Sequence, residues 1–224
     1  MGKHKQLDGA PARTMSSSVG IIDYGSGNFR SVCNWVDANG STFGPIQRGD
    51  DIEKYTHVIL PGVGSFGGAM SKLIDLDLVE PIKNLIASDA KPFLGICVGM
   101  QIMAELGLEF GRTDGLSVIK GATTLLDNTE QGGTSLTLPH IGWNSVIPNP
   151  EARLFLGSHS ELLEFYFLHS YHLDSTDPEF TFSTAFYGQS FNAAVERKNF
   201  FAVQFHPEKS QQSGSVLLQR FLEF

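Results

Sequence analysis

Along the first half of the chain, short apolar runs alternate with segments in which apolar residues recur every three or four positions. The runs have the length of buried strands, and the wider spacing is typical of helices that bury one face. The predicted strands cover residues 19–22, a stretch near 42–43, 58–60 and 91–96. The predicted helices cover residues 28–39, a short turn at 51–55, 78–86 and 100–106. This alternation predicts a parallel sheet with helices on both faces.

From residue 118 onward, strand-like segments follow one another with few helices between them. They cover residues 118–126, 146–147, 165–168, 181–186, 193–196 and 200–205, before a closing helix at 216–222. This change predicts an additional antiparallel or mixed β layer in the same domain. The polar, glycine-rich residues 127–137 are expected to form a surface loop. The predicted fold class is therefore α/β, with a mostly parallel central sheet flanked by helices and a further β layer.

The N-terminal residues 1–14 show no periodicity and precede a second methionine, Met15. We expect them to be an expression leader, with a native disordered extension as the alternative. No internal repeat or linker divides the remaining chain. Residues 15–224 are therefore expected to form one domain.

Composition narrows the classes of function. A net charge of -8 with evenly scattered Lys and Arg argues against a nucleic-acid surface and against an anionic membrane face. No apolar run approaches the 18 residues of a membrane span, and no signal peptide is visible. The two cysteines, Cys33 and Cys97, are too few for a disulfide scaffold, so a reducing cytoplasm is the expected compartment. Cys33 falls in a predicted helix and is expected to be a core residue.

The strongest chemical signal is Gly95-Ile96-Cys97-Val98-Gly99, at the end of the strand predicted at 91–96. It has the form of a nucleophile elbow with cysteine as the nucleophile. A sharp strand-to-helix turn brings backbone close on both sides, so glycine is needed two residues before and after the cysteine. The positive end of the following helix is expected to favour the thiolate. The alternative is an ordinary buried cysteine in a turn.

A cysteine nucleophile needs a base, and the base needs an orienting group. The apolar run at 200–205 leads into His206-Pro207-Glu208. Since Pro207 favours extended neighbours, and side chains two apart in an extended chain leave from the same side, His206 and Glu208 are expected to enter one pocket together. Taken alone, the segment also fits a surface turn; together with the elbow, it favours a triad of Cys97, His206 and Glu208.

Two glycine-rich loops follow predicted strands. Residues 61–68 end the strand at 58–60 and can present backbone N–H groups to a phosphate or an oxyanion, or can be a flexible turn. Residues 23–28 resemble the start of a dinucleotide fingerprint, but Arg30 stands where the third glycine belongs, so we interpret them as a plain turn.

The remaining histidines do not have the spacing of metal ligands. His169 and His172 are three apart, which turns them to opposite faces of a strand, and His140 falls on another apparent strand. There is neither an HExxH nor a CxxC motif, so no metal is expected. No chemistry is expected from His4, which falls in the leader, or from His57 and His159, which are predicted to be exposed.

With both halves of the triad identified, the chain resembles the class I glutamine amidotransferases, and among them the glutaminase subunits of imidazole glycerol phosphate synthases. The resemblance runs in order from residue 19 to residue 224. It is carried by residues 23–28 (DYGSGN), 61–64 (PGVG), 95–101 (GICVGMQ), 139–144 (PHIGWN), 169–171 (HSY) and 204–210 (QFHPEKS).

The resemblance implies a three-layer fold and a role for each matching residue. Cys97 would attack the glutamine amide, His206 would transfer protons and Glu208 would orient His206. The oxyanion hole would come from the Val98 N–H and the Gly62-Val63 peptide. The implied substrate-binding residues are Gln101, Ser170 and Tyr171. The implied partner-facing residues are Trp143, Asn144 and Lys209.

By the same resemblance, the chain needs no cofactor and passes ammonia to a partner, a (β/α)₈ cyclase subunit, for histidine biosynthesis. One alternative keeps the chemistry and changes the partner, because paralogous glutaminases feed cyclase-like proteins in surface-sugar amidation. Two others are a binding module with a vestigial triad, which the intact triad residues disfavour, and a cysteine peptidase or thioesterase, which the Met100-Gln101 and Trp143-Asn144 blocks disfavour.

Overall fold

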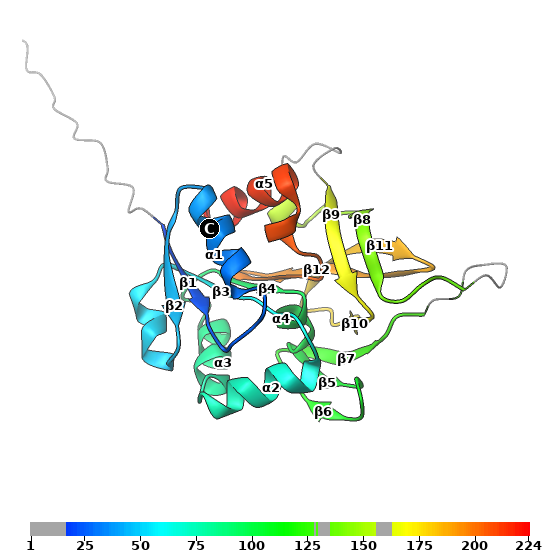
Figure 1. The fold of residues 1–224 in the computed structure, drawn as a ribbon, viewed down its shortest axis with the longest axis horizontal. Helices are drawn as coiled ribbons and strands as arrows, with labels where there is room; N and C mark the ends of the chain where they lie inside the picture. The colour runs from blue at the N-terminus through cyan, green and yellow to red at the C-terminus, as the bar shows by residue number, and fades with distance from the viewer. Residues whose placement is uncertain (1–16, 128, 130–134, 156–162) are drawn as a thin grey trace, which may run out of the picture.

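The computed structural model describes residues 17–127, 129, 135–155 and 163–224 (Figure 1). Its centre is a seven-stranded sheet of order β11-β12-β13-β4-β3-β1-β2. The strands are Ser18–Ile22 (β1), Thr42–Ile46 (β2), His57–Leu60 (β3), Phe93–Ile96 (β4), Thr181–Tyr187 (β11), Gln189–Arg197 (β12) and Phe200–Val203 (β13). The five strands from β13 to β2 run parallel, and β12 and β11 extend the sheet antiparallel.

The middle strands β3, β4 and β13 are buried at every position, which is why the sequence shows them as continuous apolar runs. Helices α1 and α5 lie on one side of the sheet, and α2 and α3 lie on the other (Figure 1). The helices are Phe29–Ala38 (α1), Phe66–Asp75 (α2), Val79–Ser88 (α3) and Gln211–Phe221 (α5), with 3-10 turns at Gly49–Lys54, Arg153–Phe155 and Pro207–Lys209. The predicted sheet with helices on both faces is confirmed.

The predicted additional β layer is also present, as two smaller sheets. A four-stranded sheet has the order β10-β7-β5-β6, and a two-stranded antiparallel sheet pairs β8 with β9. In the first, β5 runs parallel to β7 and the other pairs are antiparallel. The strands are Ala104–Gly107 (β5), Thr113–Asp114 (β6), Ile119–Leu125 (β7), His140–Ser145 (β8), Glu164–His169 (β9) and Tyr171–Asp174 (β10).

The helix predicted at residues 100–106 is wrong. The helix α4 covers only Val98–Gln101, and the chain continues into β5. Backbone groups after the first turn bond to other segments: the Ile102 carbonyl accepts from Leu116 N at 2.8 Å, and the Met103 carbonyl accepts from Ile119 N at 2.9 Å. Tertiary pairing therefore overrides the helical pattern of apolar residues.

The loop predicted at residues 61–68 ends earlier than expected, because α2 begins at Phe66. Ser65 caps this helix by accepting a bond from Gly68 N at 3.2 Å, while Phe66 is fully buried. The strand predicted at 146–147 is also wrong. The strand is β8, and Ile147 forms only an isolated bridge with Thr184.

Three predictions fall wholly or partly outside the described residues: the leader at 1–14 with His4, part of the loop at 127–137, and His159. The prediction of an exposed His57 is wrong, because it is 5% exposed and its ring packs edge-on against Phe221 at 5.2 Å. Cys33 is buried in α1, as predicted. In the part of the chain that the structure describes, no helix is long and apolar enough to cross a membrane.

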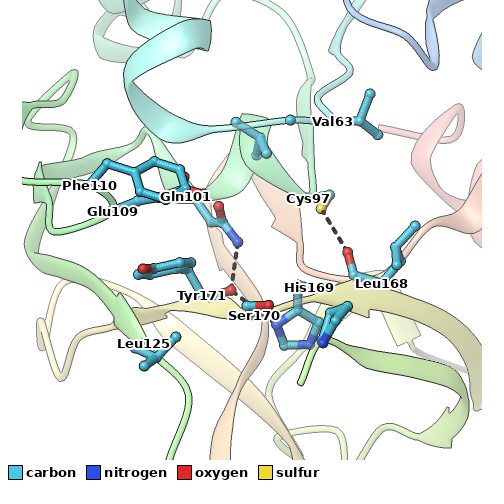
Figure 2. Close-up of a pocket in the computed structure, with 13 residues that line it drawn as sticks. Val63, Cys97, Gln101, Glu109, Phe110, Leu125, Leu168, His169, Ser170 and Tyr171 are labelled. Carbon is cyan, nitrogen blue, oxygen red and sulfur yellow. Dashed lines mark hydrogen bonds between the residues drawn. The ribbon is translucent and has the colours of Figure 1, made fainter. Parts of the chain in front are cut away.

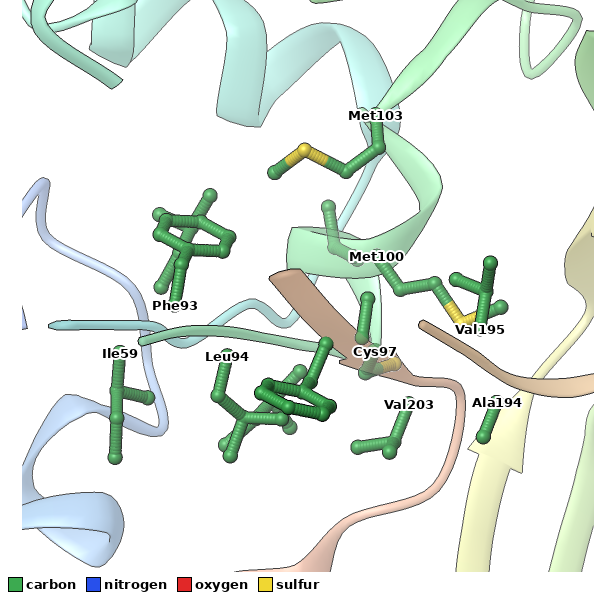
Figure 3. Close-up of a cluster of buried hydrophobic side chains, with 14 of the residues drawn as sticks. Ile59, Phe93, Leu94, Cys97, Met100, Met103, Ala194, Val195 and Val203 are labelled. Atoms are coloured by element: carbon green, nitrogen blue, oxygen red, sulfur yellow. The ribbon is translucent and has the colours of Figure 1, made fainter. Parts of the chain in front are cut away.

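Cys97 lies where the packed core meets the second β layer. Figure 3 shows it beside Leu94, Met100, Val203 and Val195, which come from β4, α4, β13 and β12. All of these side chains are buried. The core therefore fixes the position of the predicted nucleophile on several sides.

Candidate active site

Cys97 sits on a sharp turn between β4 and α4. Its backbone has φ 53° and ψ -108°, a strained conformation for a residue with a side chain. A Cβ at Gly95 would lie 2.8 Å from the Gly99 carbonyl oxygen, and one at Gly99 would overlap the Leu60 carbonyl. The two glycines are therefore needed for the steric reason that the sequence suggested.

The thiol is 3% exposed and borders a cavity (Figure 2). Its Sγ lies 3.9 Å from the Leu168 carbonyl oxygen, and the side-chain amide of Gln204 donates to it at 3.6 Å. The following helix is a single turn of four residues. The sequence predicted that the dipole of a following helix would stabilise the thiolate. With a helix of one turn, that stabilisation can come only from the few free N–H groups at its start.

His206 and Glu208 converge as predicted, although the backbone is not extended. Pro207–Lys209 forms a 3-10 turn, and the turn brings His206 Nδ1 to 2.8 Å from Glu208 Oε1. Both side chains are fully buried. A proton on Nδ1 is donated to the carboxylate, and among the described residues His206 Nε2 has no hydrogen-bond partner. Nε2 is thereby left for acid–base work.

Both groups of this pair are held in their ionised forms. Burial alone would lower the pKa of His206, but the negative charges of a Cys97 thiolate and of Glu208 outweigh burial and raise it to about 10. Burial would raise the pKa of Glu208, but the bond and charge of His206, with a bond from Asn28, hold that pKa below its usual value. At neutral pH the pair is imidazolium and carboxylate.

Asn28 is a site residue that the sequence analysis missed. Its Nδ2 donates to Glu208 Oε1 at 3.0 Å across a separation of 180 residues. The loop at residues 23–28 was interpreted as a plain turn, and no motif spacing links it to the His-Pro-Glu segment. Only the three-dimensional structure, in which α1 packs beside the 3-10 turn at Pro207–Lys209, brings the two together.

A cavity of about 430 Å³ opens in front of Cys97 (Figure 2). Six of the predicted site residues line it: Val63, Cys97, Val98, Gln101, Ser170 and Tyr171. Seven residues that were not predicted as site residues also line it: Gly64, Glu109, Phe110, Leu125, Pro139, Leu168 and His169. Glu109 is the charged residue of this lining, and its Oε2 also accepts from Phe66 N at 2.7 Å. A lone carboxylate in a largely uncharged cavity suits a ligand that carries an ammonium group.

The Gln101 side chain is fixed by its surroundings. It is 3% exposed, and Nε2 donates to the Tyr171 carbonyl at 2.7 Å and to Gln204 Oε1 at 3.1 Å. The backbone carbonyl of Gln101 accepts a hydrogen bond from Thr123 Oγ1 at 2.9 Å. Gln101 therefore connects the elbow to the strands that form the far wall of the cavity.

The loop of Gly62, Val63 and Gly64 lies directly against the elbow. A Cβ at Gly62 would lie 2.5 Å from Gly99 N and 2.8 Å from Val98 Cβ. Val98 is the first residue of α4, so its N–H has no partner within the helix. Gly64 has φ +99°, which a residue with a side chain rarely adopts. The predicted oxyanion donors are therefore adjacent to one another and to Cys97.

A second pair of buried histidines lies beside the cavity. His140 Nδ1 lies 3.2 Å from His169 Nε2, and His169 Nδ1 lies 3.0 Å from the Tyr171 carbonyl oxygen. Burial lowers the pKa of His140 to about 4, and burial with the charge of nearby histidines lowers that of His169 to about 3. Both are neutral at pH 7. Within the described residues, no group of three or more His, Cys, Asp or Glu side chains could hold a metal ion.

The predicted partner-facing residues share one surface. Trp143, on β8, is 48% exposed and packs edge-on against Tyr166 at 6.2 Å. Lys209 places its Nζ over the same Tyr166 ring at 5.8 Å. Asn144, next to Trp143, donates to the Phe186 carbonyl at 2.9 Å. The structure thus groups these residues around the two-stranded β8–β9 sheet.

The model of the family "Glutamine amidotransferase class-I" matches residues 21–223. The chain belongs to the class I glutamine amidotransferases. Within this class it belongs with the HisH proteins, because it is 42% identical to the imidazole glycerol phosphate synthase subunit HisH of Rhodopirellula baltica, over 91% of this chain and 96% of that protein. It is 41% identical to the HisH subunit of Salinibacter ruber, over 90% and 92% of the two chains. As expected for this family, it is a glutamine amidotransferase with glutaminase activity.

Among solved structures, the crystal structure described as PurLQS from Thermotoga maritima superposes with a TM-score of 0.68 at 19% identity, over 93% of this chain and 99% of that one. At this identity the likeness establishes the fold alone. It agrees with the three-layer amidotransferase fold that the sequence predicted.

Proposed function

We propose that this chain is the glutaminase subunit of an imidazole glycerol phosphate synthase, with Cys97, His206 and Glu208 as its catalytic triad. The observation that carries the assignment of residues is the convergence, at the carboxyl ends of β4 and β13, of a strained cysteine with a buried histidine–carboxylate pair. The alternative of a vestigial triad is disfavoured because both His206 and Glu208 are held in charged forms that a purely structural core would avoid.

Glutamine would lie in the 430 Å³ cavity with its side-chain amide at Cys97. Glu109 would receive the α-ammonium group, a role that its position supports although the sequence analysis did not assign it. Gln101, Ser170 and Tyr171 would form the remaining wall of the binding site.

The Cys97 thiolate would attack the amide carbon, and the carbonyl oxygen would take the negative charge. The Val98 N–H and the Gly62-Val63 peptide would stabilise that oxyanion. The C–N bond would then break, with His206 giving its proton to the departing ammonia and leaving a glutamyl thioester. A water molecule, activated by His206, would release glutamate and restore the thiolate. Glu208 would hold His206 in its Nδ1-protonated tautomer throughout.

The proposed partner is the (β/α)₈ cyclase subunit, which would receive ammonia for histidine biosynthesis. The proposed contact surface is that of Trp143, Asn144 and Lys209, which are grouped around the β8–β9 sheet. We also propose that residues 15–224 are one domain and that it works in the cytoplasm, which two free buried cysteines support.

The test is glutamine hydrolysis by the full chain, alone and with an imidazole glycerol phosphate synthase cyclase and its nucleotide ligand. We expect slow hydrolysis alone and a sharp rise with the pair. Cys97→Ala should abolish both, while the matched control Cys33→Ala should keep them, because Cys33 lies in α1 away from the cavity. Hydrolysis that ignores the cyclase would point to another partner, and hydrolysis that survives in Cys97→Ala would overturn the triad.

A further inference from the structure

Asn28 stands at the N-cap of α1 but does not cap the helix. Asparagine at this position normally accepts a hydrogen bond from an N–H of the first helical turn, which stabilises the helix. Here the side chain makes no capping bond. It is 3% exposed and donates instead to Glu208 Oε1. Asn28 therefore bonds to the triad carboxylate and not to the helix that it could cap.

Ser26 and Glu208 hold the two ends of the Asn28 amide. The Ser26 hydroxyl donates to Asn28 Oδ1 at 2.6 Å, and both residues are buried. The ionised Glu208 carboxylate can only accept, so the amide presents its NH₂ group to Glu208 and its oxygen to Ser26. The flipped amide could still donate to the Ser26 hydroxyl, which also accepts, but it would place its oxygen against the carboxylate.

The bond from Asn28 fixes the carboxylate on the atom that serves His206. Glu208 Oε1 accepts from His206 Nδ1 at 2.8 Å and from Asn28 Nδ2 at 3.0 Å. Among the described residues, Glu208 Oε2 has no hydrogen-bond partner. Without Asn28, the carboxylate would keep only one side-chain donor, His206, and could turn about its last torsion, which is intrinsically soft.

The loop that carries Asn28 is itself braced. Lys72, on α2, donates to the Gly25 carbonyl at 3.0 Å. A Cβ at Gly27 would lie 3.2 Å from Val63 Cγ2, so the loop also packs against the proposed oxyanion segment. Asn28 does not border the substrate cavity. Its influence on the reaction would therefore pass through Glu208 and leave glutamine binding unchanged.

We propose that Asn28 is a positioning residue that holds Glu208 Oε1 on His206 Nδ1, with Ser26 holding the other end of its amide. The proposal deepens the proposed function and rests on its triad. It adds a buried Ser26–Asn28–Glu208 chain behind the catalytic histidine, to which neither the motifs nor the family match assigns a role.

The first test is Asn28→Ser in the chain saturated with its cyclase. Serine caps helices well but is too short to reach Glu208. We expect kcat to fall roughly 10- to 100-fold, the range for a lost hydrogen bond to a charged group. KM for glutamine should stay within about twofold because the cavity is intact. The Tm should stay within about 4 °C of the wild type, because the helix cap that is gained offsets part of the lost bond. An unchanged kcat overturns the proposal, and so does a fall in kcat matched by a loss of folded protein.

The second test is Asn28→Asp, followed by kcat against pH. The introduced carboxyl can donate to Glu208 while protonated, but once ionised it places a like charge about 3 Å from that carboxylate. The ratio of variant to wild-type kcat should therefore fall as the pH rises. A ratio that does not vary with pH is the result of a merely structural role and overturns the proposal.

The matched control is Asn39→Ser, at the other end of the same helix. Asn39 Nδ2 donates to the Trp35 carbonyl at 2.8 Å, so this change removes one bond of comparable kind far from Glu208. We expect its kcat to equal that of the wild type. A fall as large as that of Asn28→Ser would assign the effect to α1 as a whole and overturn the proposal.

A readout that needs no turnover separates this proposal from the proposed function. In Asn28→Ser, the Nδ1 proton of His206 should exchange with solvent at least tenfold faster by NMR, because its acceptor is less firmly held. If the wild type hydrolysed no glutamine, the proposed function would fail while this exchange measurement still decided the role of Asn28. Unchanged exchange would overturn the proposal even in an active enzyme.

Discussion

His206 and His169 are two buried histidines in one active site, near enough for the charge of one to act on the other. They are 0% and 5% exposed. Burial lowers the pKa of each, yet that of His206 ends at about 10 and that of His169 at about 3. The difference comes from their neighbours. His206 faces Cys97 and the Glu208 carboxylate, whereas His169 faces His140, the Tyr171 carbonyl and the Phe191 ring.

The contrast shows how the fold divides the work between the two histidines. The charged one can give a proton to a leaving group and take one from water. The neutral pair forms a fixed chain of hydrogen bonds that ends on the Tyr171 carbonyl, which Gln101 also contacts at 2.7 Å. Burial keeps His169 neutral, and at His206 the charges of its neighbours outweigh burial.

The largest expected effect comes from Glu208→Gln, which gives His206 an uncharged partner like that of His169. The pKa of His206 should fall, and the ring should lose its preferred tautomer. We expect kcat to drop roughly 10²- to 10⁴-fold, the range of general acid–base catalysis. Steady-state glutaminase kinetics with the cyclase present would measure it. A drop of less than threefold would mean that Glu208 does not set the state of His206.

The next effect is on stability at acid pH. His169 has a folded pKa of about 3 against 6.5 when unfolded, so the unfolded state binds its proton first. The free energy of unfolding should therefore fall as the pH drops from about 6.5 toward 3. In His169→Gln this contribution is absent, so the variant should lose less stability over that range by urea unfolding. At pH 8 it should be less stable by about 1–2 kcal/mol because one buried bond is weakened. Parallel curves for the two proteins would contradict this account.

At alkaline pH, His206 should make the free energy of unfolding fall as the pH rises. The pKa of His206 is raised, so its contribution to stability is present in full below about 6.5 and is lost as the pH rises toward 10. The free energy of unfolding of the wild type should decline across this window. The decline should be smaller in Glu208→Gln, where the pKa of His206 is raised less. An identical decline in the two proteins would show that Glu208 contributes nothing to it.

The smallest expected effect is a change in the pKa of His140, one of the two neutral histidines. Asn144 Nδ2 lies 3.4 Å from His140 Nε2, so Asn144→Asp would give His140 a carboxylate neighbour. Its pKa, lowered by burial to about 4, should rise by about one to two units. NMR titration of the ring would measure the shift. No shift would mean that burial, and not the missing carboxylate, keeps this histidine neutral.

Much of this arrangement could be predicted from the sequence. The apolar runs at β3, β4 and β13 predicted a buried parallel sheet because those strands are covered on both faces. The spacing of Gly95, Cys97 and Gly99 predicted the elbow because backbone crowding at a sharp turn requires glycine. Both signals are local, and local sterics produced both.

The failures concern residues whose partners are distant in sequence. Residues 104–107 have a helical pattern, but pairing with β7 makes them a strand. Asn28 meets Glu208 across 180 residues, and Glu109 enters the cavity from the loop after β5. His57 was predicted to be exposed, but α5 covers it with Phe221. Rules based on the spacing of residues along the chain cannot predict these contacts, because they form only when distant segments pack together in the tertiary fold.

The most direct measurement is an NMR titration of the imidazole nitrogens between pH 3 and 11, in the wild type and in Glu208→Gln. We expect His206 to stay an imidazolium to about pH 10, His140 and His169 to stay neutral down to about pH 4, and only His206 to shift in the variant. A neutral His206 at pH 7 in the wild type would contradict this account, since the charges around this ring would then fail to outweigh its burial.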